Sequence, residues 1–213
     1  MGVSADRIIL SLRLHHAVAG LAIVATIAGC GGSSSESTTL SGVVREPLPA
    51  VDSIALPSLS TPGETVEFRA DPGGLQVVYF GFTNCPDVCP TTLADFTVAL
   101  RKLESEEAAK VDTVMVTVDP DRDLDVLDNY ITSFIEDGIA VGTDDPDDLL
   151  TAAEPFGASW EVRSLDDGTI EVDHSPFLYV VDDAGQLVLT WQFGATSDDM
   201  ANDLTLLFDL YVA

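Results

Sequence analysis

The spacing of apolar residues changes along the chain, and each change predicts a different kind of element. Residues 75–82 and 114–118 are continuous apolar runs, which are typical of strands buried on both faces. Apolar residues at helical spacing follow each run and predict helices over residues 93–103 and 124–134. This part of the chain therefore predicts a strand–helix–strand–helix order.

The remaining segments predict shorter elements. They are a helix at 147–153, a hairpin of 160–162 with 169–172 around Asp167-Gly168, a strand pair of 177–181 with 187–191, and a terminal helix at 200–211. The segment Glu46–Gly74 precedes the first core strand and predicts an N-terminal hairpin. This order predicts an α/β chain with a thioredoxin-like fold, an N-terminal hairpin extension and an inserted β-hairpin.

The first thirty residues predict an export signal rather than part of the fold. Arg7 and Arg13 precede the apolar run 17–28, which ends in Gly29-Cys30. The run is shorter than the roughly 20 apolar residues that a membrane span needs. Its end resembles the lipobox of bacterial and archaeal lipoproteins, in which the cysteine, here Cys30, carries the lipid. The alternative is an uncleaved anchor with an incidental cysteine.

The chain is therefore expected to divide into three parts. Residues 1–29 form a lipoprotein signal peptide, residues 30–46 a flexible tether of small polar residues, and residues 47–213 the thioredoxin-like domain. With either kind of leader, the domain is expected to be extracytoplasmic and attached to the cell membrane. His15 and His16 lie in the predicted leader and are not ligand candidates.

The charge balance excludes one class of partner. The chain has 36 Asp and Glu residues against 9 Lys and Arg residues, which gives a formal net charge of −27. Such a chain repels phosphate backbones, so we expect no nucleic-acid partner. With 213 residues, of which 46% are hydrophobic, the chain is nevertheless long and apolar enough to bury a core.

The candidate chemistry lies at the junction between the first core strand and its helix. Cys85-Pro-Asp-Val-Cys89-Pro90 occupies this junction, and three intervening residues allow both sulfurs to face one point. A helix N-terminus is expected to lower the pKa of a nearby thiol and favour the thiolate, which binds metals or attacks disulfides. The alternative is a structural disulfide or a pair of buried thiols.

His174 is the other candidate ligand, because it is the only histidine after the predicted leader. It precedes the predicted strand 177–181, whose entry loop in a thioredoxin-like arrangement lies opposite the cysteine loop. Two thiolates and one imidazole would form a soft site that suits Cu(I), and with an added ligand Cu(II). Zinc is chemically possible but prefers four ligands in structural sites. Alternatively, His174 is an ordinary surface or core histidine.

Three motifs together resemble those of the Sco/SenC family of copper chaperones. Phe80-Gly-Phe-Thr-Asn-Cys85-Pro-Asp-Val-Cys89-Pro-Thr-Thr-Leu93 is similar to the cysteine loop of the family. Val118-Asp119-Pro-Asp-Arg122-Asp123 resembles its second motif, and Val172-Asp173-His174-Ser175, followed by a strand and Asp182, resembles its third. The resemblance extends from about Val51 to the C-terminus.

This resemblance implies a thioredoxin-like fold and one copper ion per chain, bound by Cys85, Cys89 and His174. It also implies a membrane-anchored copper chaperone that delivers copper to the binuclear copper site of cytochrome c oxidase. The partner would be the oxidase subunit that holds this site, or another extracytoplasmic cuproprotein. A chaperone of this kind need not be an enzyme.

Two other function classes remain open. The first is a thiol–disulfide oxidoreductase that uses Cys85 and Cys89 as a redox pair to reduce cysteines of an exported partner. Pro176 favours this alternative, because thioredoxin-like reductases carry a cis-proline at this place; most X–Pro bonds are trans. The second is a binding module whose cysteines only crosslink.

The residues around the second motif allow a structural or a functional role. Asp119 is either an ordinary turn residue or lies in the outer shell of the metal site, and Asp123 could cap the helix that starts at Leu124. Tyr79, Trp160 and Trp191 are expected to pack in the core or the hairpin.

Overall fold

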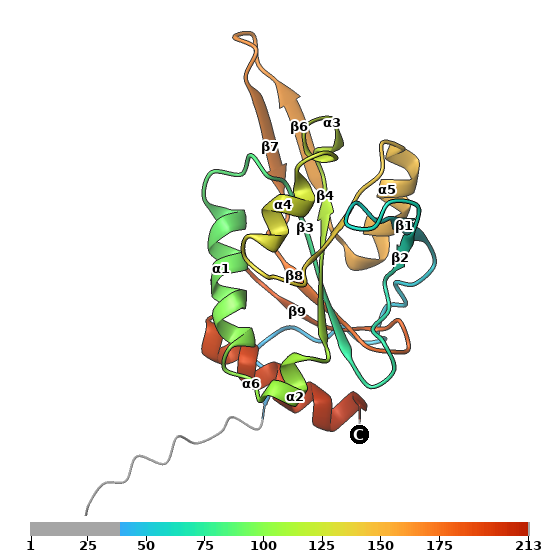
Figure 1. Ribbon diagram of the computed structural model, residues 1–213, viewed down its shortest axis with the longest axis vertical. Helices are drawn as coiled ribbons and strands as arrows, with labels where there is room; N and C mark the ends of the chain where they lie inside the picture. The colour runs from blue at the N-terminus through green and yellow to red at the C-terminus, as the bar shows by residue number, and fades with distance from the viewer. Residues whose placement is uncertain (1–38, 213) are drawn as a thin grey trace, which may run out of the picture. The chain divides into compact units, whose positions relative to one another are not determined.

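The computed structural model describes residues 39–212, and it shows a twisted central sheet at the heart of this region (Figure 1). The sheet has five strands in the order β5-β4-β3-β8-β9. These strands are β3 (Leu75–Gly81), β4 (Val111–Thr117), β5 (Ile139–Val141), β8 (Leu178–Val181) and β9 (Leu187–Trp191). Strands β3, β4 and β5 run parallel, β8 is antiparallel to β3, and β9 is antiparallel to β8. This mixed sheet confirms the predicted thioredoxin-like fold class.

Six α-helices are seen in the part of the chain that the structure describes. They are α1 (Val88–Leu100), α2 (Ser105–Ala108), α3 (Pro120–Asp123), α4 (Leu127–Thr132), α5 (Pro146–Ala153) and α6 (Ser197–Leu207). A 3₁₀ turn at Glu154–Phe156 follows α5, and a π-helical turn at Phe208–Val212 follows α6. Helices α1 and α6 pack against each other, whereas α4 contacts β4 and β5.

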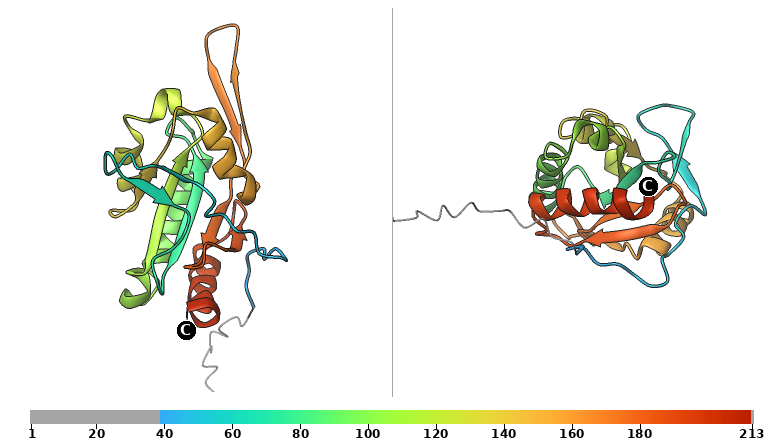
Figure 2. Two further views of the ribbon diagram at one scale, coloured as in Figure 1. Left: turned by 90° about the vertical axis from the view of Figure 1, so that its right-hand side faces the viewer. Right: turned by 90° about the horizontal axis from the view of Figure 1, so that it is seen from below.

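Two hairpins lie outside the central sheet, as the sequence predicted. Strands β1 (Ala55–Pro57) and β2 (Thr65–Glu67) form the N-terminal hairpin, and β6 (Trp160–Ser164) and β7 (Ile170–His174) form the inserted one. Gly168 has a φ of +85°, which the turn between β6 and β7 requires and which other residues rarely adopt. The β6–β7 hairpin extends away from the central sheet (Figures 1 and 2), and the last residue of β7, His174, lies beside Cys89.

The core forms on both faces of β3, the middle strand of the sheet. All seven residues of β3 are buried, as its continuous apolar pattern predicts. Trp191 is also buried, and its Nε1–H donates a hydrogen bond of 2.8 Å to Asp203 Oδ2 in α6. The same carboxylate accepts the backbone N–H groups of Ser41 and Gly42, at 2.8 and 2.9 Å. Asp203 therefore joins the start of the described chain to α6 and to the end of β9.

The region after β4 differs from the prediction in two respects. Of the helix predicted over residues 124–134, only α4 is helical, because the N–H of Val126 binds the carbonyl of Asp123 three residues back and residues 124–126 form a turn. The short helix α3 precedes the predicted range. Strand β5 was not predicted, since three apolar residues are too few to show a period.

The 3₁₀ turn after α5 has a local cause. Pro155 lacks the backbone N–H that would continue the α-helical ladder. Gly157, with a φ of +73°, then ends the turn in the left-handed region.

The predicted leader 1–29 and Cys30 lie outside the described residues. Ser41 and Val43 belong to the predicted tether 30–46, and Val43 exchanges two backbone hydrogen bonds of 2.9 Å with Thr190. Within residues 39–212, no helix has both the length and the apolar character that a membrane crossing needs.

We expect the stability of the protein to be most sensitive to truncation of helix side chains that are buried in the core. Leu204 in α6 is fully buried, whereas Leu150 in α5 is 56% exposed. Leu204→Ala should therefore lower the free energy of unfolding by about 2–5 kcal/mol, because it leaves a cavity. Leu150→Ala should change it by less than about 0.5 kcal/mol. Urea denaturation of the two variants measures both values, and equal losses would contradict this description of the core.

Candidate metal centre

The two cysteines are held by different parts of the strand–loop–helix junction. Cys89 is the second residue of α1 and is fully buried, so its position is fixed by the helix and the core. Cys85 lies in the loop between β3 and α1 and is only partly buried. Its backbone N–H donates to the carbonyl of Phe82 at 3.4 Å, which closes a turn. One sulfur is therefore fixed in the interior and the other is presented by a loop.

Both cysteines are free thiols in this structure, so the predicted alternative of a structural disulfide is not what it shows. The backbone N–H of Cys89, in the first turn of α1, donates to Cys85 Sγ at 3.2 Å. Hydrogen bonds of this kind stabilise negative charge on a sulfur at the start of a helix.

His174 meets the cysteines from the opposite side of the site, as the sequence predicted. It is the last residue of β7, and its Nε2 lies 3.5 Å from Cys89 Sγ. Its Nδ1 lies 3.1 Å from the carbonyl oxygen of Ser175. Because a carbonyl can only accept, the proton of the neutral ring belongs on Nδ1. The lone pair of Nε2 is then directed toward the thiols.

Two aromatic rings fix the plane of the imidazole. Tyr79 and Phe82 each meet His174 edge to face, with ring centroids 5.9 and 5.6 Å apart. Edge-to-face pairs of this kind restrict side-chain rotation in a buried setting. The ring therefore has little freedom to turn its Nε2 away from the sulfurs.

The three donor atoms are close enough together for one metal ion. Cys85 Sγ, Cys89 Sγ and a ring nitrogen of His174 all lie within 4.8 Å of one another. Two metal–sulfur bonds of about 2.3 Å span at most about 4.6 Å, so a single ion can contact all three with small side-chain movements. In the part of the chain described here, this is the only group of three or more potential ligands. The residues therefore fit a small, soft metal ion.

The electrostatics of the site differ from the sequence prediction. Burial raises the pKa of Cys89 to about 12, although a helix N-terminus was expected to lower it. The cost of moving a thiolate out of water outweighs the helix at this position. Burial also lowers the pKa of His174. Without metal, the favoured pair is thus a neutral Cys89 thiol that donates to a neutral imidazole.

Several hydroxyl groups near the thiols lack hydrogen-bond partners. Those of Tyr79, Thr92 and Tyr130 are buried without a partner in hydrogen-bonding geometry, although the Tyr79 hydroxyl lies beside Cys89 and Thr92. Burial and the nearby thiols raise the pKa values of both tyrosines, so these phenols stay protonated. The sequence predicted only core packing for Tyr79. The alternation of side chains along β3 gives no sign that its hydroxyl reaches the site.

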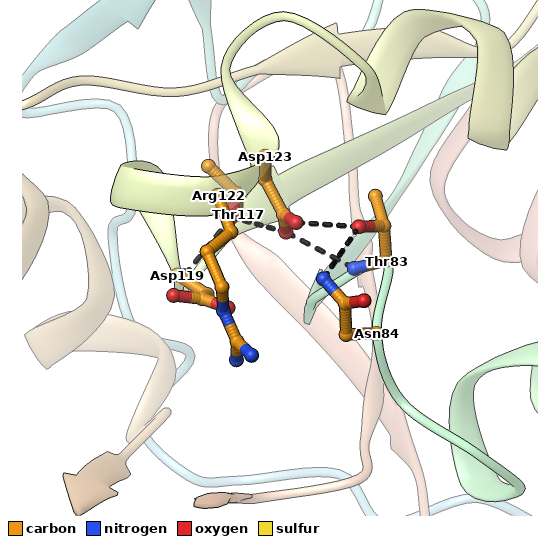
Figure 3. Close-up of polar contacts among 6 residues, drawn as sticks. All are labelled: Thr83, Asn84, Thr117, Asp119, Arg122 and Asp123. Atoms are coloured by element: carbon orange, nitrogen blue, oxygen red, sulfur yellow. Dashed lines mark hydrogen bonds and ion pairs between the residues drawn. The ribbon is translucent and has the colours of Figure 1, made fainter. Parts of the chain in front are cut away.

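The structure places Asp119 in the turn before α3, which is one of its two predicted roles, whereas Asp123 lacks the predicted capping role. Asp119 is buried, and its carboxylate forms an ion pair with Arg122. Asp123 is the last residue of α3 and caps no helix. Its carboxylate instead accepts hydrogen bonds from Thr83 and Thr117 (Figure 3). The sequence analysis missed this contact because it joins residues that lie about forty positions apart.

Comparison with known proteins shows which family this chain resembles. The SCO1/SenC family model matches residues 58–209. A SCO2-like protein of Rickettsia prowazekii is 37% identical over 119 residues, which are 54% of this chain and 56% of that protein. Protein SCO1 homolog 1 of Arabidopsis thaliana, a mitochondrial protein, is 30% identical over 110 residues, which are 51% of this chain and 33% of that protein. The chain thus spans about half or less of the length of these relatives.

Solved structures show the same fold. The apo Sco1 protein of Thermus thermophilus matches with a TM-score of 0.67 and 31% identity, covering 79% of this chain and 97% of that one. ScoI of Bradyrhizobium japonicum with copper bound matches with a TM-score of 0.61 and 28% identity, covering 71% and 94%. Yeast Sco1 with copper bound matches with a TM-score of 0.64 and 26% identity, covering 74% and 87%.

The different settings of the two thiols predict different reactivity. In the metal-free protein at about pH 8, Cys85 should react with iodoacetamide at least about tenfold faster than Cys89, because thiolate content and access control alkylation. Cys89 is fully buried and its pKa is about 12. Mass spectrometry of the cysteine peptides over time measures the two rates. In denaturant the two cysteines should react alike, and equal rates in the folded protein would contradict the prediction.

Proposed function

The chain belongs to the SCO1/SenC family, and from this premise we propose that it is a copper chaperone. It binds one copper ion through Cys85, Cys89 and His174 and delivers it to the binuclear copper site of cytochrome c oxidase. The observation that carries this proposal is the set of three soft donor atoms within 4.8 Å of one another. The Bradyrhizobium japonicum and yeast relatives with copper bound support the choice of metal.

The donor set favours copper over zinc. Two sulfurs and one imidazole nitrogen form a soft, three-coordinate site, which suits Cu(I). Structural zinc prefers four ligands, and among residues 39–212 no fourth Cys, His, Asp or Glu joins this group. Copper is the cargo of such a protein rather than a group that stays with it.

The geometry also suggests an order of release. The carbonyl of Ser175 keeps the proton of His174 on Nδ1, so Nε2 is free to bind the metal. Binding requires Cys89 to lose its proton, because the thiolate is the ligand. Cys85, on its partly exposed loop, is the ligand that an incoming thiolate of a recipient protein can replace first. Cys89 and His174 are then the last ligands to release the copper ion.

A thiol–disulfide oxidoreductase is the second candidate function. It is supported by the two free cysteines, which already lie in contact, since the backbone N–H of Cys89 donates to Cys85 Sγ at 3.2 Å. The feature that favoured it in the sequence is absent, however. Glu46–Pro47 is the only cis peptide bond between residues 39 and 212, so Ser175–Pro176 is trans.

We further propose that the protein is a lipoprotein held at the outer face of the cell membrane. The support is the apolar run 17–28, followed by Gly29-Cys30 at the end of a short leader with two arginines. Lipid on Cys30 would anchor the domain through the tether. The recipient is then an extracytoplasmic cuproprotein, of which the copper-site subunit of cytochrome c oxidase is the one we propose.

Copper binding should depend on all three donors. The wild-type protein should bind one Cu(I) per chain, and Cys85→Ser or Cys89→Ser should abolish tight binding, because one thiolate and one imidazole make a poor Cu(I) site. His174→Ala should weaken binding by about 10- to 100-fold or more. Competition with a chromophoric Cu(I) chelator under anaerobic conditions measures these affinities.

The third cysteine provides the matched control. Cys30 lies outside the proposed site, so Cys30→Ser should bind Cu(I) like the wild type whether or not the native cysteine carries lipid. The His174→Ala variant also separates the two functions, since disulfide cycling of Cys85 and Cys89 does not need an imidazole. Normal copper affinity together with lost reductase turnover in His174→Ala would reject the chaperone and favour the oxidoreductase.

The anchor predicts a separate result. Wild-type protein expressed with its leader should partition into the detergent phase of Triton X-114, because Cys30 carries lipid. Cys30→Ser should move it to the aqueous phase or leave it with an uncleaved leader, which intact-mass analysis detects. Wild-type protein without lipid on Cys30 would reject this anchor.

A further inference from the structure

Asp123 is a buried carboxylate that the proposed ligand set does not use. Its side chain is completely buried at the end of α3. Oδ2 accepts the backbone N–H of Thr83 at 3.0 Å and the hydroxyl of Thr117 at 2.7 Å. Oδ1 accepts the hydroxyl of Thr83 at 2.6 Å. Figure 3 shows the carboxylate between these two threonines.

Within residues 39–212, no Lys, Arg or His side chain forms an ion pair with this carboxylate. Arg122, the adjacent residue, is paired with Asp119 instead. A buried carboxylate needs partners, and here three hydrogen bonds supply them. Burial of this carboxylate therefore costs free energy unless all three hydrogen bonds are kept, and this requirement makes the contact rigid.

The hydrogen bonds of Asp123 join the loop that carries Cys85, here called the thiol loop, to the neighbouring strand β4. Thr83 directly follows Phe82, whose carbonyl accepts the N–H of Cys85, so Thr83 lies inside the turn that presents this cysteine. Thr117 is the last residue of β4, and Asp123 is in the short helix that follows β4. The carboxylate thus fixes the turn before Cys85 to the end of the adjacent parallel strand.

The two cysteines depend on this contact to different degrees. Cys89 is held by α1 and by its burial in the core. Cys85 is partly buried in the loop, and Asp123 is what ties that loop to β4. A metal site with three ligands needs the loop thiol to stay close to the other two donors.

We propose that Asp123 is a positioning residue, which holds the Cys85 turn so that its sulfur stays within reach of Cys89 and His174. This inference rests on the proposed copper-binding function of the same site. Asp123 itself touches neither the metal nor the thiols. It acts through Thr83, and it keeps the site organised before the metal arrives.

The experiment compares Asp123 with a second carboxylate of the same burial. Asp203 is also completely buried and also accepts three hydrogen bonds, from Ser41, Gly42 and Trp191, none of which belongs to the site. Asp123→Ala and Asp203→Ala should therefore destabilise the fold to a similar extent. Only Asp123→Ala should affect the thiol loop.

Three measurements are made on each variant: Cu(I) affinity by chelator competition, the iodoacetamide rate of Cys85 in metal-free protein, and thermal unfolding. Asp123→Ala should weaken Cu(I) binding by about 10- to 100-fold, the range typical of residues that orient metal ligands. It should also raise the alkylation rate of Cys85, but not of Cys89, by about threefold or more, because the loop opens locally. Asp123→Asn should keep Cu(I) affinity and the Cys85 alkylation rate close to those of the wild type. The amide oxygen can replace Oδ2, and the hydroxyl of Thr83 can turn to accept a hydrogen bond from the amide NH2 group.

A milder pair of variants covers the case in which Asp123→Ala does not fold. Thr83→Val removes the hydroxyl that donates to Asp123 Oδ1, and with it a 3.5 Å hydrogen bond from Asn84, in a partly exposed residue. It should change both readouts in the same direction as Asp123→Ala. Thr83→Ser keeps the hydroxyl and should behave like the wild type.

Two results would overturn the proposal. One is wild-type affinity and a wild-type Cys85 rate in folded Asp123→Ala or, if that does not fold, in Thr83→Val. The other is an equal loss in Asp203→Ala, which would show a general effect of stability. If the wild type itself binds no Cu(I), the copper function fails, and the alkylation rates still decide whether Asp123 positions Cys85.

Discussion

The site depends on one buried contact, the approach of Cys89 Sγ and His174 Nε2 to 3.5 Å across 85 residues of sequence. Cys89 comes from the helix that follows the middle strand, and His174 ends a strand of the inserted hairpin. The antiparallel pairing of β3 with β8 brings the end of that hairpin back to the end of β3. Without this pairing the chain would have one cysteine on a loop, one at the start of a helix, and an isolated histidine.

Cys89 and His174 meet in a buried position, and this burial disfavours the charged form of each side chain. A Cys89 pKa of about 12 and a lowered His174 pKa mean that both groups are neutral in the metal-free protein. A metal must therefore displace the proton of Cys89, and part of its binding free energy is spent on that step. For the copper chaperone that we propose this is useful, because a site that is stable without its metal can also release it.

The sequence predicted the parts of the fold that follow from strong periodicity. The apolar run of β3, the helical spacing of α1 and the Asp167-Gly168 turn all lie where they were expected. The helix predicted after β4 is shorter in the structure, because the turn before Leu127 comes from hydrogen bonding and not from apolar spacing. Local pattern cannot show which carbonyl an N–H group will choose.

The candidate ligands could be predicted from the sequence, whereas the environment of their side chains could not. The spacing of Cys85 and Cys89 and the single later histidine are visible in the sequence, and the structure brings all three together. The raised pKa of Cys89 and the contact of Asp123 with Thr83 depend on burial and on the packing of distant segments. These properties follow only from the folded chain.

The central claim is that two sulfurs and one imidazole nitrogen bind a single copper ion. X-ray absorption at the copper edge tests it most directly, on Cu(I)-loaded wild type and on the His174→Ala variant. The account predicts two sulfur neighbours and one imidazole nitrogen in the wild type, and loss of the imidazole signal alone in the variant. A wild-type spectrum with a single sulfur neighbour, or with an imidazole signal that survives in His174→Ala, would contradict it.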